Sequence, residues 1–159
     1  MSIENLHEAL EAIQLNIELC DFELTPDIEN AILKAENLLE TRLPLSFKVF
    51  LKKYGCWGIE SFEISGIIND TFEKNGIKDS IGITLEERAS GDLPDNLIYL
   101  SDVGDGFYYY LDSSKSDENG EYPVVIWGHG LKPEQAEIVY EDFGAFLLHQ
   151  VRQAIDFED

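Results

Sequence analysis

Basic residues are scarce in this chain. Lys and Arg number 11 against 32 Asp and Glu, which gives a formal net charge of −21 over 159 residues. A surface with this much negative charge repels nucleic-acid phosphates and anionic lipids. The composition therefore argues against nucleic acid and membranes as direct partners. Two interpretations of the acidity stay open: it confers solubility only, or it attracts a basic protein partner.

Cysteines and long apolar segments are also sparse. Cys20 and Cys56 are far apart and form neither a redox motif nor a zinc motif, so we expect free, buried thiols in a reducing compartment. The first residues lack the basic and apolar regions of a signal peptide, and no apolar run approaches the ~20 residues of a membrane helix. The sequence therefore predicts a cytoplasmic protein.

Apolar residues are plentiful despite the charge. They make up 44% of the chain and include nine Phe, seven Tyr and two Trp. A chain of this length and composition can bury a core without disulfides or a metal ion. We therefore expect a single domain over residues 1–159, with no cofactor.

The first third of the chain has helical spacing. Apolar residues recur every three or four positions and predict an amphipathic helix over about residues 2–20. Thr25 as N-cap and Pro26 at the first helical position predict the start of a second helix. Pro44 is expected to open a third helix, which Gly55 ends as a left-handed cap.

After Gly55 the apolar spacing changes to a period of two. This period and the turn residues predict strands over residues 57–67, 97–101, 107–111 and 122–127. Helices are expected over residues 80–89 and from about residue 142, with polar loops at residues 69–78 and 112–121. The order predicts an α+β fold: a mostly antiparallel sheet flanked by N-terminal helices and a C-terminal helix.

The familiar motifs for metal, phosphate and acyl chemistry fail. An EF-hand alignment of the 112–121 loop puts Lys115 and Ile126 where acidic ligands are required. The turn 104–106 lacks the spacing and the following helix of a phosphate loop. There is no GxSxG motif, and Cys56 with His129 fits a buried thiol beside a core Trp better than a catalytic pair. No metal-ligand spacing connects the three histidines, His7, His129 and His149.

The segment 107–111 is rich in aromatic residues. Alternation puts Tyr108 and Tyr110 on the face opposite to a core face of Phe107, Tyr109 and Leu111. The two tyrosines are either covered by a helix or form an exposed platform of the kind enriched at protein interfaces. With acidic residues near both ends of the strand, they make a candidate partner-binding set: Asp102, Asp105, Tyr108, Tyr110, Asp112, Asp117, Glu118 and Glu121.

Four segments, in this order, resemble the SUKH superfamily in its Smi/Knr-like branch. They are residues 36–55, with Leu-Pro before an aromatic helix that ends in Tyr-Gly, then 98–112, 120–127 and 140–147. The resemblance covers about residues 25–151 and leaves the N-terminal helix as an addition. It implies an α+β domain with no catalytic role. Many bacterial members are immunity proteins that neutralise toxin domains, often nucleases, and fungal relatives regulate cell-wall assembly.

The residues and the resemblance support three hypotheses. The first is a non-catalytic immunity protein that binds a basic toxin domain, with charge steering the encounter. The alternative is an intracellular regulatory or scaffold module of the cell-wall-assembly type, without a toxin partner. The third is a small hydrolase built on paired carboxylates, which no sequence motif supports. Homodimerisation through a sheet edge is a further possibility.

Overall fold

The computed structural model describes residues 2–72 and 79–158, which form an α+β fold with two antiparallel sheets. The five α-helices of these residues are α1 (Ser2–Leu15), α2 (Ile28–Leu39), α3 (Leu45–Tyr54), α4 (Ser80–Ala89) and α5 (Phe143–Glu158). The strands are β1 (Asp21–Phe22), β2 (Trp57–Ile59), β3 (Phe62–Ile64), β4 (Leu97–Gly104), β5 (Phe107–Asp112), β6 (Val124–Trp127) and β7 (Glu137–Tyr140). The predicted fold class is confirmed.

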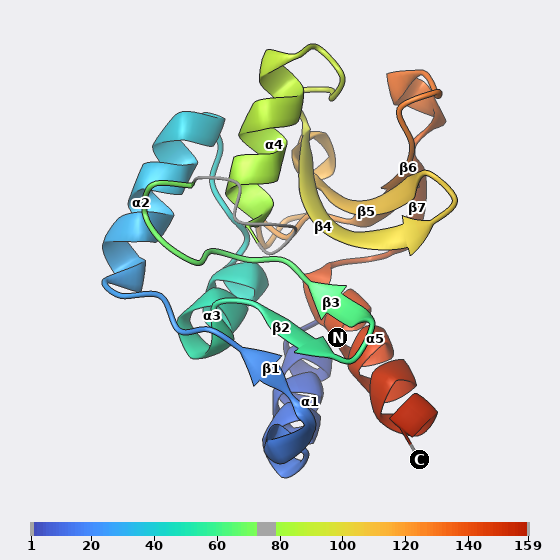
Figure 1. Ribbon diagram of the computed structural model, residues 1–159. Helices are drawn as coiled ribbons and strands as arrows, with labels where there is room; N and C mark the ends of the chain where they lie inside the picture. The colour runs from blue at the N-terminus through green and yellow to red at the C-terminus, as the bar shows by residue number, and fades with distance from the viewer. Residues whose placement is uncertain (1, 73–78, 159) are drawn as a thin grey trace.

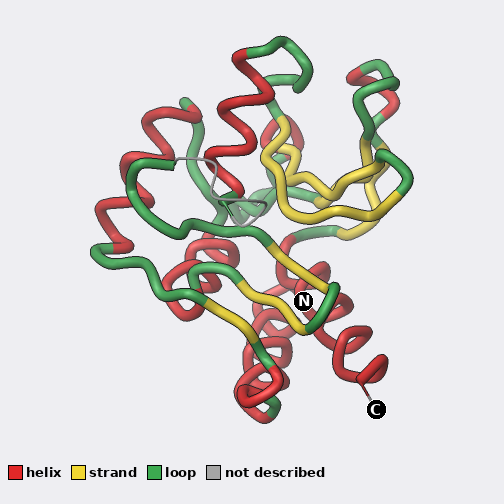
Figure 2. The backbone as a smooth tube through the Cα atoms, viewed as in Figure 1, coloured by secondary structure: helices red, strands yellow, loops and turns green. Residues whose placement is uncertain are grey.

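The two sheets meet at β3 and β4. One sheet has the order β1-β2-β3 and the other the order β4-β5-β6-β7, and Figure 2 shows them as two separate groups of strands. The Ser65 N–H, just after β3, donates to the Leu100 carbonyl in β4 at 2.8 Å. Helices α1 and α5 pack on each other below the sheets, and α4 lies against β4 (Figure 1).

The main core lies between the helices and one face of the larger sheet. Its centre is an aromatic group in which the Phe143 ring lies 5.0 Å from Phe47 and 5.3 Å from Phe50, centroid to centroid. A second apolar cluster covers the opposite face of that sheet and consists of Ile83, Leu93, Leu97, Tyr99, Tyr110, Val125 and Trp127. The larger sheet is therefore buried on both faces, which fixes the register of β4 and β5.

The N-terminal predictions are right in kind and wrong at two boundaries. Helix α1 ends at Leu15, and a short 3-10 helix, Ile17–Leu19, follows it. Thr25 is not an N-cap: its buried hydroxyl donates to the Ile67 carbonyl, and α2 begins at Ile28 after Asp27 with φ 50°. A long-range hydrogen bond to a buried acceptor takes the hydroxyl that the local pattern assigns to the helix.

The predicted strand at 57–67 is a hairpin. Strands β2 and β3 pair antiparallel across a tight turn in which Glu60 has φ 52°. Apolar residues stand on both sides of this turn, so the alternation continues through it and conceals the reversal. Outside the turn the predicted faces hold, with Ile64 buried and Glu63 on the opposite face.

Strands β1 and β7 have no counterpart in the sequence predictions. Both are short, and β7 is an outer strand whose Ile138 and Val139 are exposed, so no buried alternation marks it. Pairing of two copies through such an edge stays a prediction. Of the predicted loop at 69–78, residues 73–78 lie outside the described part of the chain. The predicted helix at 80–89 is confirmed as α4.

The cysteines behave as expected of free thiols. Cys56 is buried, Cys20 is partly buried, and neither forms a disulfide. The Trp57 indole N–H donates to the Cys20 sulfur at 3.2 Å. Their compartment stays a prediction.

Asp79 predicts a pH dependence of stability. It is fully buried at the start of α4, where Oδ1 accepts the Gly82 N–H at 2.9 Å and Oδ2 has no hydrogen-bond partner among the described residues. Burial raises the pKa of Asp79. The folded chain therefore holds this proton more tightly than the unfolded chain. The stability that the protonated Asp79 contributes is fully present below the unfolded pKa of about 3.9. It is lost as the pH rises through the folded-state pKa.

We expect the unfolding free energy of the wild type, minus that of Asp79→Asn, to fall as the pH rises from about 4, the unfolded pKa, toward neutrality. Asparagine keeps an oxygen for the Gly82 N–H but does not titrate. All other titrating groups are the same in both proteins, so their effects cancel in the difference. Urea unfolding of both proteins between these pH values measures the difference. A difference that stays constant or grows with pH would contradict the assignment.

Candidate functional site

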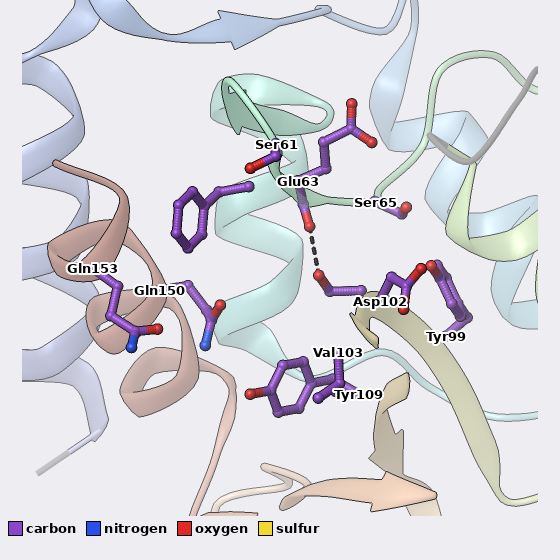
Figure 3. A pocket seen from close by; sticks show the side chains of 11 residues that line it. Ser61, Glu63, Ser65, Tyr99, Asp102, Val103, Tyr109, Gln150 and Gln153 are labelled. Atoms are coloured by element: carbon purple, nitrogen blue, oxygen red, sulfur yellow. Dashed lines mark hydrogen bonds between the residues drawn. The ribbon is translucent and has the colours of Figure 1, made fainter. Parts of the chain in front are cut away.

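A polar groove of about 330 Å³ opens between β3 and β4, beside the C-terminal half of α5 (Figure 3). We call it the β3–β4 groove. Its polar lining comes from three segments that are distant in sequence and includes Ser61, Tyr99, Ser101, Asp102, Gln150 and Gln153. Polar groups that converge in one hollow are typical of binding sites.

The groove lies where β4 is irregular. Hydrogen bonds connect β3 and β4 at two points: the Ser65 N–H donates to the Leu100 carbonyl, and the Ser101 hydroxyl donates to the Glu63 carbonyl (dashed in Figure 3). The pairing of β4 with β5 shifts register between Tyr99 and Ser101, and again before Gly104. Such irregularities bend and twist a strand, and the β4 residues at these positions line the groove.

Asp102 supplies the carboxylate of the groove. Glu63 contributes its carbonyl oxygen and turns its own carboxylate away from Ser101, as Figure 3 shows. Asp102 is exposed, and its Oδ1 accepts the Gly104 N–H at 2.8 Å. It forms no ion pair with any described residue.

Tyr99 lines the groove and belongs to the second apolar cluster. Its side chain is 5% exposed, and its ring packs on Tyr108 and Tyr110 with centroids 5.8 and 6.0 Å away. Burial, and then the negative charge of Asp102, raise the pKa of Tyr99, so the hydroxyl keeps its proton at neutral pH. This hydroxyl forms no hydrogen bond with the described residues, and Tyr99 lines the cavity.

The groove lies among chain segments without positive charge. Residues 1–33, 54–73 and 89–114 contain no Lys or Arg, and they supply β1, the β2–β3 hairpin and the β4–β5 hairpin. Asp102 lines the groove and is exposed, and two further exposed acids, Glu60 and Asp105, lie in the β2–β3 and β4–β5 turns; we call these three the acidic rim. Arg152 of α5 pairs with Glu8.

The predicted partner-binding residues fall into two groups at opposite ends of β5. Asp102, Asp105 and Tyr108 lie near the β4–β5 turn, where the two acids are exposed and Tyr108 is half-buried. Asp112, Asp117, Glu118 and Glu121 lie at the other end, about 17 Å away at ~3.4 Å per strand residue. They do not form one continuous site.

Three of the predicted contact residues are buried and cannot form an exposed surface. Tyr110 is 0% exposed and lies in the second apolar cluster together with Ile83 of α4. Of the two alternatives for Tyr110, the one in which a helix covers it is therefore confirmed. Asp112 is 2% exposed and accepts hydrogen bonds from Asn96 Nδ2 and the Ser114 N–H. Glu121 is 6% exposed and accepts from the N–H and hydroxyl of Ser46.

Asp117 and Glu118 are exposed in the loop before β6. Asp117 Oδ1 accepts the N–H groups of Asn119 and Glu121 at 2.8 and 3.0 Å, so it organises the loop. Tyr109, predicted as a core residue, lines the groove and also packs on Phe146 at 5.0 Å. No sequence motif marks the groove residues, because they come together only through the folding of β3, β4 and α5.

The contacts of His129 bear on whether it could form a catalytic pair with Cys56. Its Nε2 lies 3.2 Å from Glu87 Oε2, and its Nδ1 lies 3.1 Å from the Asp92 carbonyl oxygen. Both ring nitrogens are therefore directed at groups other than Cys56. In the described part of the chain, no group of three His, Cys, Asp or Glu residues is arranged to hold a metal ion. No helix there is long and apolar enough to cross a membrane.

Comparison with protein families decides the relationship. Residues 3–152 match the model of the SUKH_5 family, described as SMI1-KNR4 cell-wall. The chain belongs to the SUKH_5 family. This confirms the resemblance to the SUKH superfamily, and the SUKH_5 match includes the acidic rim and the groove residues other than Gln153. It also begins at residue 3 and so includes α1, which the sequence analysis treats as an addition.

Proposed function

We propose that this SUKH_5 chain is a non-catalytic immunity protein that neutralises a basic toxin domain, a nuclease, by binding over its positively charged cleft. The observation that carries the proposal is a polar groove lined mainly by two stretches without Lys or Arg, residues 54–73 and 89–114, with the exposed acids of the acidic rim in these same stretches. Carboxylates on such a rim would take the positions that substrate phosphates take in the nuclease. Blockade of this kind needs affinity and no chemistry.

Electrostatics favours a basic partner in two ways. A chain with a net charge of −21 attracts a basic protein over the Debye length, about 8 Å at physiological salt, and this speeds the encounter. Carboxylates that form no ion pair with a described residue, such as Asp102, can form ion pairs in the complex. The same charge opposes nucleic acid as the direct ligand.

Apolar residues next to the rim would complete an interface. Val103 and Phe107 are 43% and 39% exposed in the β4–β5 hairpin, on either side of Asp105. Protein interfaces combine apolar contact with a polar, charged periphery, and the hairpin offers both within a few residues.

One finding favours a second candidate. The family description refers to the cell wall, which fits a regulatory or scaffold module of cell-wall assembly without a toxin partner. In that function the acidic rim would bind a component of the cell-wall machinery, and no toxin gene would be needed nearby.

The test of function is to examine the genes beside this one for a basic toxin domain and to co-express any such domain with this chain. We expect restored growth and a complex that co-elutes in size-exclusion chromatography. We also expect the association rate to fall about tenfold or more between low and high salt, because steering is screened. Absence of both rescue and complex, together with specific binding to a purified cell-wall assembly protein, would favour the second candidate.

Charge-neutral variants locate the surface. Asp102→Asn with Asp105→Asn is expected to slow association by about threefold to tenfold, because both charges lie on the rim. The matched control is Glu134→Gln with Glu137→Gln, which removes the same charge from two exposed positions, one before β7 and one at its first residue. Equal slowing by both pairs would mean that only the net charge matters and that the rim is not the contact.

A further inference from the structure

We propose that the β3–β4 groove receives one arginine side chain of the partner, with the Asp102 carboxylate and the Tyr99 hydroxyl as its polar contacts. This inference rests on the proposed function and adds to it the chemical group that is recognised. The groove would then be the central contact of the interface, and the acidic rim its charged periphery.

The Tyr99 hydroxyl is available for a hydrogen bond to a ligand in the groove. Tyr99 is 5% exposed and lines the groove, and its hydroxyl forms no hydrogen bond with the described residues. Tyrosines with an apolar ring in the protein and a hydroxyl that can reach a partner are enriched at protein interfaces. Because the hydroxyl keeps its proton, it can accept from an incoming N–H and donate to a neighbouring oxygen.

The groove supplies acceptors in several directions. Asp102 uses Oδ1 for the Gly104 N–H and has further acceptor capacity on both carboxylate oxygens. The Gln150 side chain is 8% exposed, and its Nε2 donates to the Tyr140 hydroxyl at 3.5 Å, which leaves its carbonyl oxygen for another donor. A guanidinium group carries five N–H donors in a planar fork, so it fits divergent acceptors better than a lysine ammonium.

The size and walls of the groove also fit a single long side chain. Its volume of about 330 Å³ is at the lower end of the range for binding cavities, about 300–1,000 Å³. Tyr109 forms one wall and faces the hollow in Figure 3, so its ring can contact a guanidinium plane. Among the described residues that line the groove there is no Lys or Arg.

The test uses acetyl-arginine methylamide as the probe and the full-length, isotope-labelled chain as the receptor. We expect binding in the millimolar range, seen as amide chemical-shift changes confined to the groove, at Ser101, Asp102 and the Gln150 side chain. The uncharged citrulline analogue should cause no such shifts. Absence of shifts with the arginine probe, or equal shifts over all acidic surfaces, would overturn the inference.

Two variants separate a specific contact from general charge. Asp102→Asn keeps an oxygen for the Gly104 N–H and should weaken probe binding about tenfold, while Tyr99→Phe keeps the ring packing and should weaken it about fivefold. Glu134→Gln removes an equal charge from the exposed segment before β7 and should leave binding within a factor of two, roughly the effect of a distant screened charge. Equal weakening by Asp102→Asn and Glu134→Gln would contradict the groove as the site.

The two proposals fail separately. If a cognate toxin binds the wild type and Tyr99→Phe with equal affinity, the arginine contact is wrong and the proposed function stands. If the arginine probe binds the groove but growth is not restored and no toxin complex forms, the groove assignment stands and the toxin-neutralising function is wrong.

Discussion

Replacing Gly66 by alanine is expected to lower the unfolding free energy by about 3 kcal/mol or more. A Cβ at this position would lie 1.7 Å from the Gly55 carbonyl oxygen and 2.9 Å from Leu51 Cδ2. The backbone oxygen cannot move alone, because it accepts the Ile67 N–H at 3.0 Å. The chain after β3 must therefore separate from the end of α3, and packing is lost on both sides.

The matched control for this substitution is Gly130→Ala. A Cβ at Gly130 has no atom within 4 Å, so the substitution should change stability by no more than about 0.5 kcal/mol. Denaturant unfolding followed by tryptophan fluorescence gives both values. Similar stabilities of the two variants would mean that residues 55 and 66 are not in contact.

The Gly66 substitution also concerns the function. The Gly66 carbonyl accepts the Ser80 N–H at 2.7 Å, so this residue connects the end of β3 to the start of α4. A shift there would move β3 relative to β4 and reshape the β3–β4 groove. We therefore expect any soluble, folded Gly66→Ala protein to lose binding of the arginine probe even below its unfolding transition.

Removing the carboxylate of Glu121 is expected to cost about 3 kcal/mol of unfolding free energy. The carboxylate accepts the Ser46 N–H at 3.1 Å and the Ser46 hydroxyl, and both residues are buried. In Glu121→Ala these two donors at the start of α3 lose their acceptor without gaining access to water. Hydrogen bonds to a buried charged acceptor contribute more than neutral ones, which explains the size of the effect.

The neighbouring exposed acid provides the comparison. Glu118→Ala lies in the same loop but is exposed and should change stability by no more than about 0.5 kcal/mol. Glu121→Gln keeps one acceptor oxygen and should fall between the two. Thermal and urea unfolding measure all three variants. A Glu121→Ala protein as stable as Glu118→Ala would show that the contact with Ser46 is not structural.

Much of the fold was accessible from the sequence because short-range physics decides it. Helix α4 occupies the predicted residues 80–89, and α5 begins at Phe143 after the capping residue Asp142, whose Oδ1 accepts the Ala145 N–H. Spacing of apolar residues and capping chemistry act over four or five residues, so a single sequence reveals them. The family also followed from sequence segments alone, and the match over residues 3–152 confirms it.

The hidden hairpin and the missed strands show where local patterns end. The alternation from Trp57 to Ile64 is compatible with one strand, and the reversal at Glu60 becomes visible only when β2 pairs with β3. Thr25 has the chemistry of an N-cap, but a buried carbonyl from Ile67 binds its hydroxyl. In both cases a partner distant in sequence competes with the local signal and wins.

The sequence by itself determined the charge, the fold class and the family, because composition and periodicity are properties of the chain alone. Only the tertiary structure decided which acids are exposed: Asp102 and Asp105 face solvent, whereas Glu121 is buried against Ser46. Alternation assigns Tyr110 to a face of β5 but does not say that α4 covers that face. The β3–β4 groove likewise exists only where segments distant in sequence meet, because its lining comes from β3, β4, β5 and α5.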